Sequence, residues 1–180
     1  MASAYQRYQA KELDLTWIPV EQIPHIQKNT PSALLVVPRL TTEFYTFNVA
    51  KPPFDNEKVR KALYLTLDRP LIAEHIIGLR KPAATLTPPE VDGFNAPNIV
   101  ELSQPLTERV EQAKKLLNDA GYNEKHPLQF EIFYNKYATH EKVALALASE
   151  WKKQLGADVK LRTMEWKTYL GERNLSLIHI

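Results

Sequence analysis

The chain has 180 residues, of which 44% are hydrophobic and 24% charged, and its formal net charge is +2. This length suits one domain with its own core, and no apolar run approaches the roughly 18 residues that a membrane-spanning helix needs. The 23 basic and 21 acidic residues are mixed without a basic stripe, so we expect no nucleic-acid partner. The chain lacks cysteine, which excludes disulfides, thiolate metal sites and cysteine nucleophiles.

The first 50 residues combine helical and extended patterns. Met1 leads within a few residues to the polar Tyr5-Gln6-Arg7, so we expect no signal peptide in this chain. Helical composition then predicts short helices over residues 5–12 and 20–28. Alternating or continuous apolar residues predict three strands, over residues 13–17, 33–37 and 41–48.

The clearest pattern in the chain lies in residues 51–68, KPPFDNEKVRKALYLTLD. Apolar side chains there follow the spacing i, i+3, i+4, i+7 and i+8, which places them on one face of a helix. We predict Asp55 as the N-cap, because its carboxylate can accept the free amide hydrogens of the first turn. The predicted helix would therefore anchor the core through Val59, Ala62, Leu63, Thr66 and Leu67.

The second half of the chain predicts alternating helices and strands. A short helix after Pro70 ends at Gly78, and a proline-rich irregular stretch occupies residues 79–104. A strand–helix–strand order with a long helix between favours parallel neighbours. We therefore predict an α/β fold with a mixed sheet flanked by helices, its later elements being helix 107–120, strand 128–135, helix 139–155, strand 158–162 and helix 166–173.

No pattern in the chain supports catalysis or a metal. His140-Glu141 begins like a metalloprotease motif, but Ala144 stands where the second histidine is required. We therefore expect no enzyme activity, no catalytic residue, no metal and no cofactor. The alternative is a hydrolase that uses Glu90 and Asp92, which only their position on the long loop favours.

A cluster of aromatic and polar residues near the end of the chain is better suited to binding. An indole offers a flat apolar wall, and a guanidinium fits a carboxylate through two hydrogen bonds. These chemistries suit a peptide or another carboxylate ligand, although ordinary packing explains the same residues. The cluster consists of Tyr134, Asn135, His140, Trp166, Tyr169 and Arg173.

Several longer motifs resemble the periplasmic oligopeptide-binding proteins of ABC transporters, which are extracytoplasmic solute-binding proteins of the peptide and nickel family. The resemblance covers residues 5–173 and is most specific in KPPFDNEKVRKALYLTLDR at residues 51–69. It continues through TPP (87–89), EQAKKLLNDAGY (111–122), SEWKKQLGADVKL (149–161) and EWKTYL (165–170).

The resemblance implies one lobe of a type II periplasmic-binding-protein fold. Residues 1–174 would form the C-terminal lobe, and residues 175–180 would be a tail from cloning read-through or a truncated strand. With the missing N-terminal lobe it would enclose oligopeptides in the periplasm and deliver them to an ABC permease, so the single lobe would bind little by itself. The alternative is a stand-alone interaction domain that self-associates through its exposed former lobe interface.

The resemblance also implies ligand-binding residues. Trp166 and Arg173 match a tryptophan and an arginine that lie against the ligand in the family. His140 matches a histidine that can face the C-terminal end of the peptide, and Tyr45 matches an aromatic position on a strand that approaches the cleft. Thr46 stands where close relatives can carry an acidic residue. The family's aspartate that grips the peptide amino terminus lies beyond Arg173, and we expect it to be absent.

Overall fold

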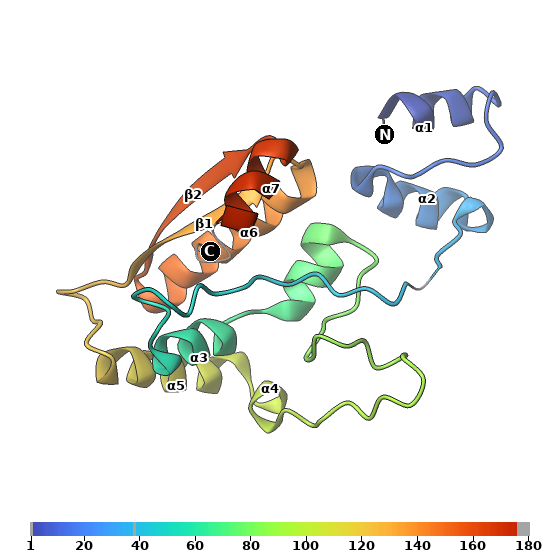
Figure 1. The fold of residues 1–180 in the computed structure, drawn as a ribbon. Helices are drawn as coiled ribbons and strands as arrows, with labels where there is room; N and C mark the ends of the chain where they lie inside the picture. The colour runs from blue at the N-terminus through green and yellow to red at the C-terminus, as the bar shows by residue number, and fades with distance from the viewer. Residues whose placement is uncertain (1, 38, 176–180) are drawn as a thin grey trace.

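The computed structural model describes residues 2–37 and 39–175, which form helices around a two-stranded sheet. The first helices, α1 and α2, lie to one side of a body that runs from α3 to α7 (Figure 1). None of the helices described is long and apolar enough to cross a bilayer. The elements are α1 (Ala2–Gln9), η1 (Val20–Gln22), α2 (Ile23–Asn29), η2 (Pro31–Ala33), α3 (Glu57–Leu65), the π-helix η3 (Leu71–Ile77), α4 (Val100–Ser103), α5 (Leu106–Asp119), β1 (Gln129–Asn135), α6 (Ala138–Leu155), β2 (Asp158–Met164) and α7 (Trp166–Leu175).

Strands β1 and β2 pair in parallel, with Gln129 opposite Asp158 and Asn135 opposite Met164. The long helix α6 connects them, and Gly156 ends it in the left-handed conformation at φ 67°. Glycine adopts that conformation at little cost, because it has no Cβ to clash with the backbone. The α/β class and the parallel strand–helix–strand unit are therefore confirmed.

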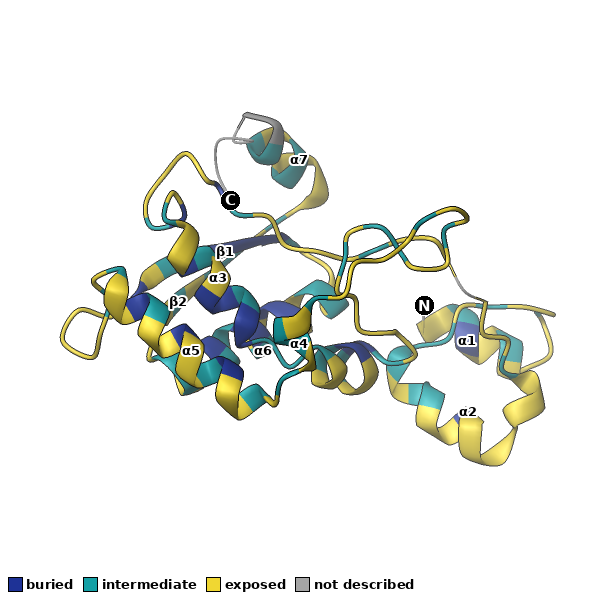
Figure 2. Cartoon of the chain, turned by 90° about the horizontal axis from the view of Figure 1, so that it is seen from below, coloured by how far each residue is buried: buried dark blue, intermediate teal, exposed yellow. Residues whose placement is uncertain are grey.

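The core lies between α3, α5, α6 and β1, where the buried positions concentrate (Figure 2). The predicted stripe of α3 is buried at Val59, Ala62, Leu63 and Thr66, whereas Leu67 is half-buried beyond the end of the helix. Burying each large aliphatic side chain contributes about 1.5–3 kcal/mol. The stripe packs with Ala113 and Leu117 of α5 and with Leu147 and Trp151 of α6.

The carboxyl end of α3 accepts hydrogen bonds from two other helices. Arg109 of α5 is buried and donates from Nη1 to the carbonyl oxygens of Leu65, at 2.7 Å, and Leu67, at 3.3 Å. Trp151 of α6 donates from Nε1 to the carbonyl oxygen of Leu63 at 3.1 Å. Helix carbonyls at this end have no partner within the helix, and a cation there also complements the helix dipole.

The predicted N-cap of α3 is wrong by one residue. Asn56 is the cap, because its backbone is extended (φ −82°, ψ 117°) and its Oδ1 accepts from the amide of Lys58 at 2.9 Å. Asp55 lies one position before the cap and is exposed. Its carbonyl oxygen instead accepts from Arg60 Nη1 at 3.1 Å.

The three strands predicted in the first 50 residues are not formed. Residues 13–17, 34–37 and 41–48 have no ladder partner in the described chain. A strand needs a neighbour for its amide and carbonyl groups, and the apolar pattern by itself does not supply one. These segments and the residues beside them leave large apolar side chains exposed, at Leu15, Trp17, Leu35, Val36, Val37, Leu40, Phe44 and Val49.

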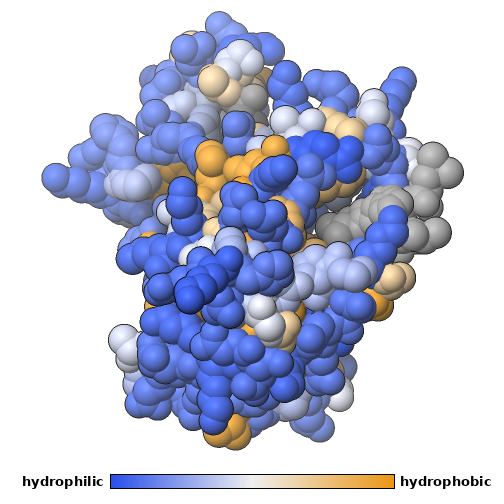
Figure 3. All heavy atoms as spheres, turned by 90° about the vertical axis from the view of Figure 1, so that its left-hand side faces the viewer, coloured by the Kyte–Doolittle hydropathy of each residue, from blue (hydrophilic) through white to orange (hydrophobic). Residues whose placement is uncertain are grey.

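The surface otherwise agrees with the mixed charge of the sequence. The face on the left of Figure 1 is mostly hydrophilic, with apolar atoms gathered in a small area near its centre (Figure 3).

The proline-rich stretch 79–104 is irregular as predicted, apart from α4. Residues 176–180 of the predicted tail lie outside the described residues.

We expect Arg109→Met to lower the free energy of unfolding by about 1–3 kcal/mol, because it removes the donor to the buried carbonyl of Leu65 and to the half-buried carbonyl of Leu67. Urea unfolding followed by circular dichroism measures the change. Lys114→Met is the matched control, since Lys114 is exposed on the same helix. Equal stability of the Arg109 variant and the wild type would contradict this role.

Candidate functional site

The carboxyl ends of β1 and β2 bring the candidate residues to one edge of the sheet. Asn135 ends β1 opposite Met164, near the end of β2, and α7 begins at Trp166. In parallel α/β sheets, residues that follow the strands meet at this edge, where ligands commonly bind. The sheet therefore positions the start of α6, with His140, beside the start of α7.

Five aromatic residues gather at this edge, and we call them the aromatic cluster. The rings of Trp166 and Tyr169 stack with centroids 5.8 Å apart and an interplanar angle of 20°. Tyr169 also packs on Phe133 of β1 at 4.9 Å. Trp166 is 54% exposed, whereas Phe133 is buried, so the cluster has a covered base and an open face. Its members are Tyr45, Phe133, Tyr134, Trp166 and Tyr169.

Tyr45 belongs to this cluster through its phenol group. Burial of the hydroxyl raises the pKa of Tyr45 to about 12, and the nearby phenols of Tyr169 and Tyr134 raise it further. Burial also raises the pKa of Tyr134, with a smaller contribution from the charge of Glu141. The phenol of Tyr45 thus lies near α7 and β1, although the extended segment 41–48 forms no strand.

His140 lies in the first turn of α6 and is half-buried. Its Nδ1 is 2.6 Å from Oδ1 of Asn135, and its ring meets that of Tyr137 edge-on at 5.0 Å. Because an amide oxygen only accepts, the contact is a hydrogen bond when Nδ1 carries the proton, which leaves Nε2 as an acceptor. Asn135 thereby orients the imidazole at the end of β1.

Arg173 follows Trp166 by seven residues on α7, so the two side chains share a face of the helix with Tyr169. It is half-buried and has no hydrogen-bond or ion-pair partner among residues 2–37 and 39–175. The structure thus stacks Trp166 on Tyr169 and places the phenol of Tyr45 near that of Tyr169. It joins His140 to the sheet edge through Asn135 and sets Arg173 two turns along α7.

Sequence reasoning missed Phe133 and Arg162. Phe133 falls on the face of β1 that alternation assigns to polar residues, yet Tyr169 covers one part of it and the guanidinium of Arg162 lies 4.3 Å from its ring centroid. An aromatic residue among the polar positions of a strand was the available signal. Arg162 carries no such signal, because exposed arginines are common in strands that face solvent on one side.

Other parts of the described chain have fewer features that suit a functional site. A hollow of about 270 Å³ lies between α2 and η3, and Tyr45, His140, Trp166 and Arg173 do not line it. No group of three or more potential metal ligands occurs within the described part of the chain. Glu90 and Asp92 are both exposed. A hydrogen bond from Lys81 lowers the pKa of Glu90, which is opposite to the shift that a general acid needs.

An open aromatic surface with an imidazole and a guanidinium beside it, at the carboxyl edge of parallel strands, is suited to binding a ligand. The chain belongs to the bacterial extracellular solute-binding proteins, family 5, whose model for the "Middle" region matches residues 1–177. Proteins of this family bind solutes.

Similar proteins agree with this family assignment. The probable deoxycholate-binding periplasmic protein YgiS of Escherichia coli K12 is 61% identical over 95% of this chain and 32% of its own length. The periplasmic oligopeptide-binding protein OppA of Haemophilus influenzae is 41% identical over 93% of this chain and 32% of its own length. The chain thus spans about a third of the length of these relatives.

Solved structures confirm the fold. The Escherichia coli murein tripeptide binding protein MppA matches with a TM-score of 0.87 and 39% identity, over 96% of this chain and 34% of that protein. Haemophilus influenzae OppA, in complex with RPPGFSPFR, matches with a TM-score of 0.84 and 38% identity, over 98% of this chain and 36% of that protein. These neighbours are type II periplasmic binding proteins, so the predicted fold is confirmed.

We expect stability to fall between pH 10 and about pH 12, in part because of Tyr45. Its pKa is about 12 in the folded chain against an ordinary 10.0, so the unfolded chain loses this proton first as the pH rises. The contribution is intact below pH 10 and is lost progressively above it. Urea unfolding at pH 9 and pH 11 should show a smaller drop for Tyr45→Phe than for the wild type. Equal drops would contradict the burial of the phenol.

Proposed function

We propose that this chain is the peptide-binding C-terminal lobe, residues 1–174, of a periplasmic solute-binding protein that delivers oligopeptides to an ABC importer. The observation that carries the proposal is the open aromatic cluster beside His140 and Arg173. Family membership supports it, as does the 41% identity with an oligopeptide-binding protein. The lobe acts by binding and uses no cofactor or catalytic residue.

Four residues would contact the ligand. The exposed indole of Trp166 provides a flat apolar wall, and Tyr45 on the extended segment 41–48 would add to it. The guanidinium of Arg173 has no partner in the described chain, and it can hold a carboxylate through two hydrogen bonds. His140 has one ring nitrogen directed to Asn135, so the other can hydrogen-bond to a peptide group.

The lobe supplies only one side of such a site. Trp166 is 54% exposed, so its open face would need a second surface to exclude water from the ligand. An N-terminal lobe in the remaining two-thirds of a longer protein would provide that surface. The partners are then oligopeptides, the N-terminal lobe and a membrane-bound ABC permease, in the periplasm, with no role for nucleic acid.

A second candidate ligand is an amphipathic steroid carboxylate. The relative at 61% identity is described as a probable deoxycholate-binding protein. Its identity to this chain is higher than the 41% of the oligopeptide-binding protein. The same residues suit this chemistry, because rigid apolar rings can lie on Trp166 and Tyr169 while the carboxylate meets Arg173. Affinity for the two ligands, measured side by side, decides between the candidates.

We expect Trp166→Ala, in the full-length protein, to weaken binding by about tenfold to a hundredfold, because an aromatic anchor is lost. Arg173→Gln should weaken it by about tenfold through loss of the carboxylate contact. Titration calorimetry with trialanine and with sodium deoxycholate measures both effects. Lys114→Gln on the exposed face of α5 is the control. Unchanged affinity in both site variants would refute the assignment.

We also expect the isolated chain to bind either ligand much more weakly than the full-length protein, whose affinity for its ligand should be micromolar or tighter. The reason is that one surface leaves the ligand hydrated on its other side. The same calorimetry on both proteins tests this. Equal affinities would show that residues 1–174 form a complete site.

The isolated chain should also self-associate. Leu35, Val36 and Val37 are 73%, 55% and 63% exposed on an extended segment without a ladder partner in the described residues. Such segments pair readily with other chains. Light scattering should show a concentration-dependent rise in mass that Val36→Lys reduces. A monomer at high concentration would exclude the alternative of a self-associating interaction domain.

A further inference from the structure

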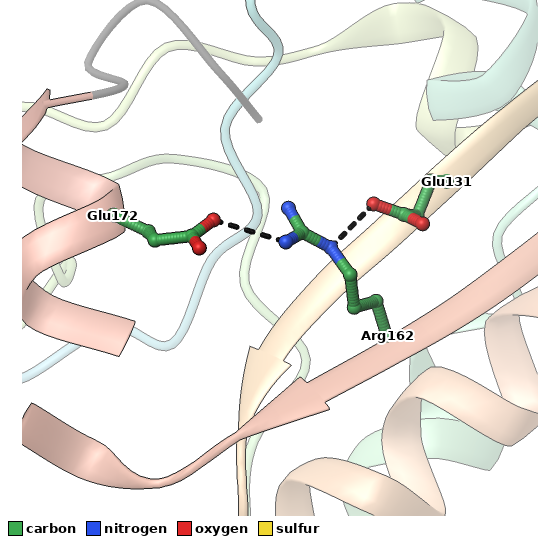
Figure 4. Close-up of polar contacts among 3 residues, drawn as sticks. All are labelled: Glu131, Arg162 and Glu172. Carbon is green, nitrogen blue, oxygen red and sulfur yellow. Dashed lines mark hydrogen bonds and ion pairs between the residues drawn. The ribbon is translucent and has the colours of Figure 1, made fainter. Parts of the chain in front are cut away.

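Arg162 connects α7 to the sheet (Figure 4). It lies on β2 directly opposite Phe133 of β1. Its Nε is 2.7 Å from Oε1 of Glu131 on β1, and its Nη1 is 2.9 Å from Oε2 of Glu172 on α7. Its guanidinium lies 4.3 Å from the centroid of the Phe133 ring. One side chain therefore bridges both strands and the last helix.

The charges of Glu131, Arg162 and Glu172 indicate that Arg162 is not itself a ligand site. Two carboxylates surround one guanidinium, so its positive charge is already balanced within the protein. Burial lowers the pKa of Arg162, but hydrogen bonds with Glu172 and Glu131 outweigh burial and raise it, so the guanidinium remains charged. The group can hold its two neighbours in place, and it has no excess charge with which to attract an anion.

Helix α7 has few other attachments. None of residues 166–173 is fully buried. Tyr169 rests on Phe133, and Glu172, three residues later and on the same side, meets Arg162. Phe133 thus lies in contact with both Tyr169 and Arg162. These two adjacent contacts prevent the helix from rotating about its axis, and that rotation would turn Trp166, Tyr169 and Arg173 away from the sheet edge.

We propose that Arg162 is a positioning residue: with Glu131 and Glu172 it fixes the orientation of α7 and so presents Trp166, Tyr169 and Arg173 as one surface. The ligand-binding part of this inference rests on the proposed function. Arg162 itself does not touch the ligand, and its effect on affinity passes through the helix.

The test compares Arg162→Met with the wild type in the full-length protein. Methionine keeps an apolar stem over Phe133 and removes both ion pairs. Amide hydrogen exchange in residues 166–173 should become about threefold to tenfold faster, as expected for two half-exposed ion pairs, while exchange in α6 stays the same. Affinity for trialanine or sodium deoxycholate should fall by a similar factor, and Arg162→Lys should restore part of both losses.

Two controls isolate the cause. Arg7→Met removes a comparable exposed ion pair, Arg7 Nε to Glu12 Oε2 at 2.9 Å, far from the site, and should change neither measurement. Sodium chloride at about 1 M should bring the wild type toward the Arg162→Met variant, because it shortens the Debye length to about 3 Å.

Each outcome decides one part of the inference. Unchanged exchange in α7 of the Arg162→Met variant would overturn the proposal, and so would faster exchange with unchanged affinity. If the wild type binds neither probe while the variant shows faster exchange in α7, the proposed function fails. The role of Arg162 in fixing the orientation of α7 is then still supported.

Discussion

The rest of the structure depends on how the backbone carbonyls at the carboxyl end of α3 obtain hydrogen-bond donors. The carbonyl of Leu65 accepts a hydrogen bond from Arg109 of α5, and that of Leu63 accepts from Trp151 of α6 and from the hydroxyl of Thr66 at the helix cap. Buried polar groups without partners are costly, so three helices must meet in one arrangement. This constraint also ties α3 to α6, the helix that connects β1 to β2.

Away from this centre the molecule is held more weakly, and the candidate site lies in that outer region. Trp166 is mostly exposed, and α7 rests on the sheet through Tyr169 and through Glu172 with its partner Arg162. Binding surfaces are often drawn from less stable elements, because they must adjust to a ligand. The candidate site thus depends on a few contacts at the edge of a well-packed centre.

The first 50 residues show what the rest of a longer protein would contribute. Many of their large apolar side chains are exposed, and their extended backbone lacks ladder partners in the described chain. Tyr45 is itself 38% exposed, but its phenol lies near those of Tyr134 and Tyr169. The segment also packs on the core through Phe47, whose ring lies 5.0 Å from that of Phe54, while much of its other apolar surface is uncovered. This arrangement agrees with a chain that spans about a third of its relatives.

The sequence by itself determined α3, α5, α6, the two strands and the family, because helical and strand periodicity and the motifs within them are local properties. It also pointed to most of the candidate binding residues, which lie between Tyr134 and Arg173 in the chain. Only the tertiary structure decided that Asn56 caps α3, that Arg109 is buried, and that Phe133 and Arg162 support α7. It also decided against the three early strands. Those features depend on which distant groups meet, since hydrogen-bond partners and strand neighbours are contributed by other segments, and no local pattern encodes them.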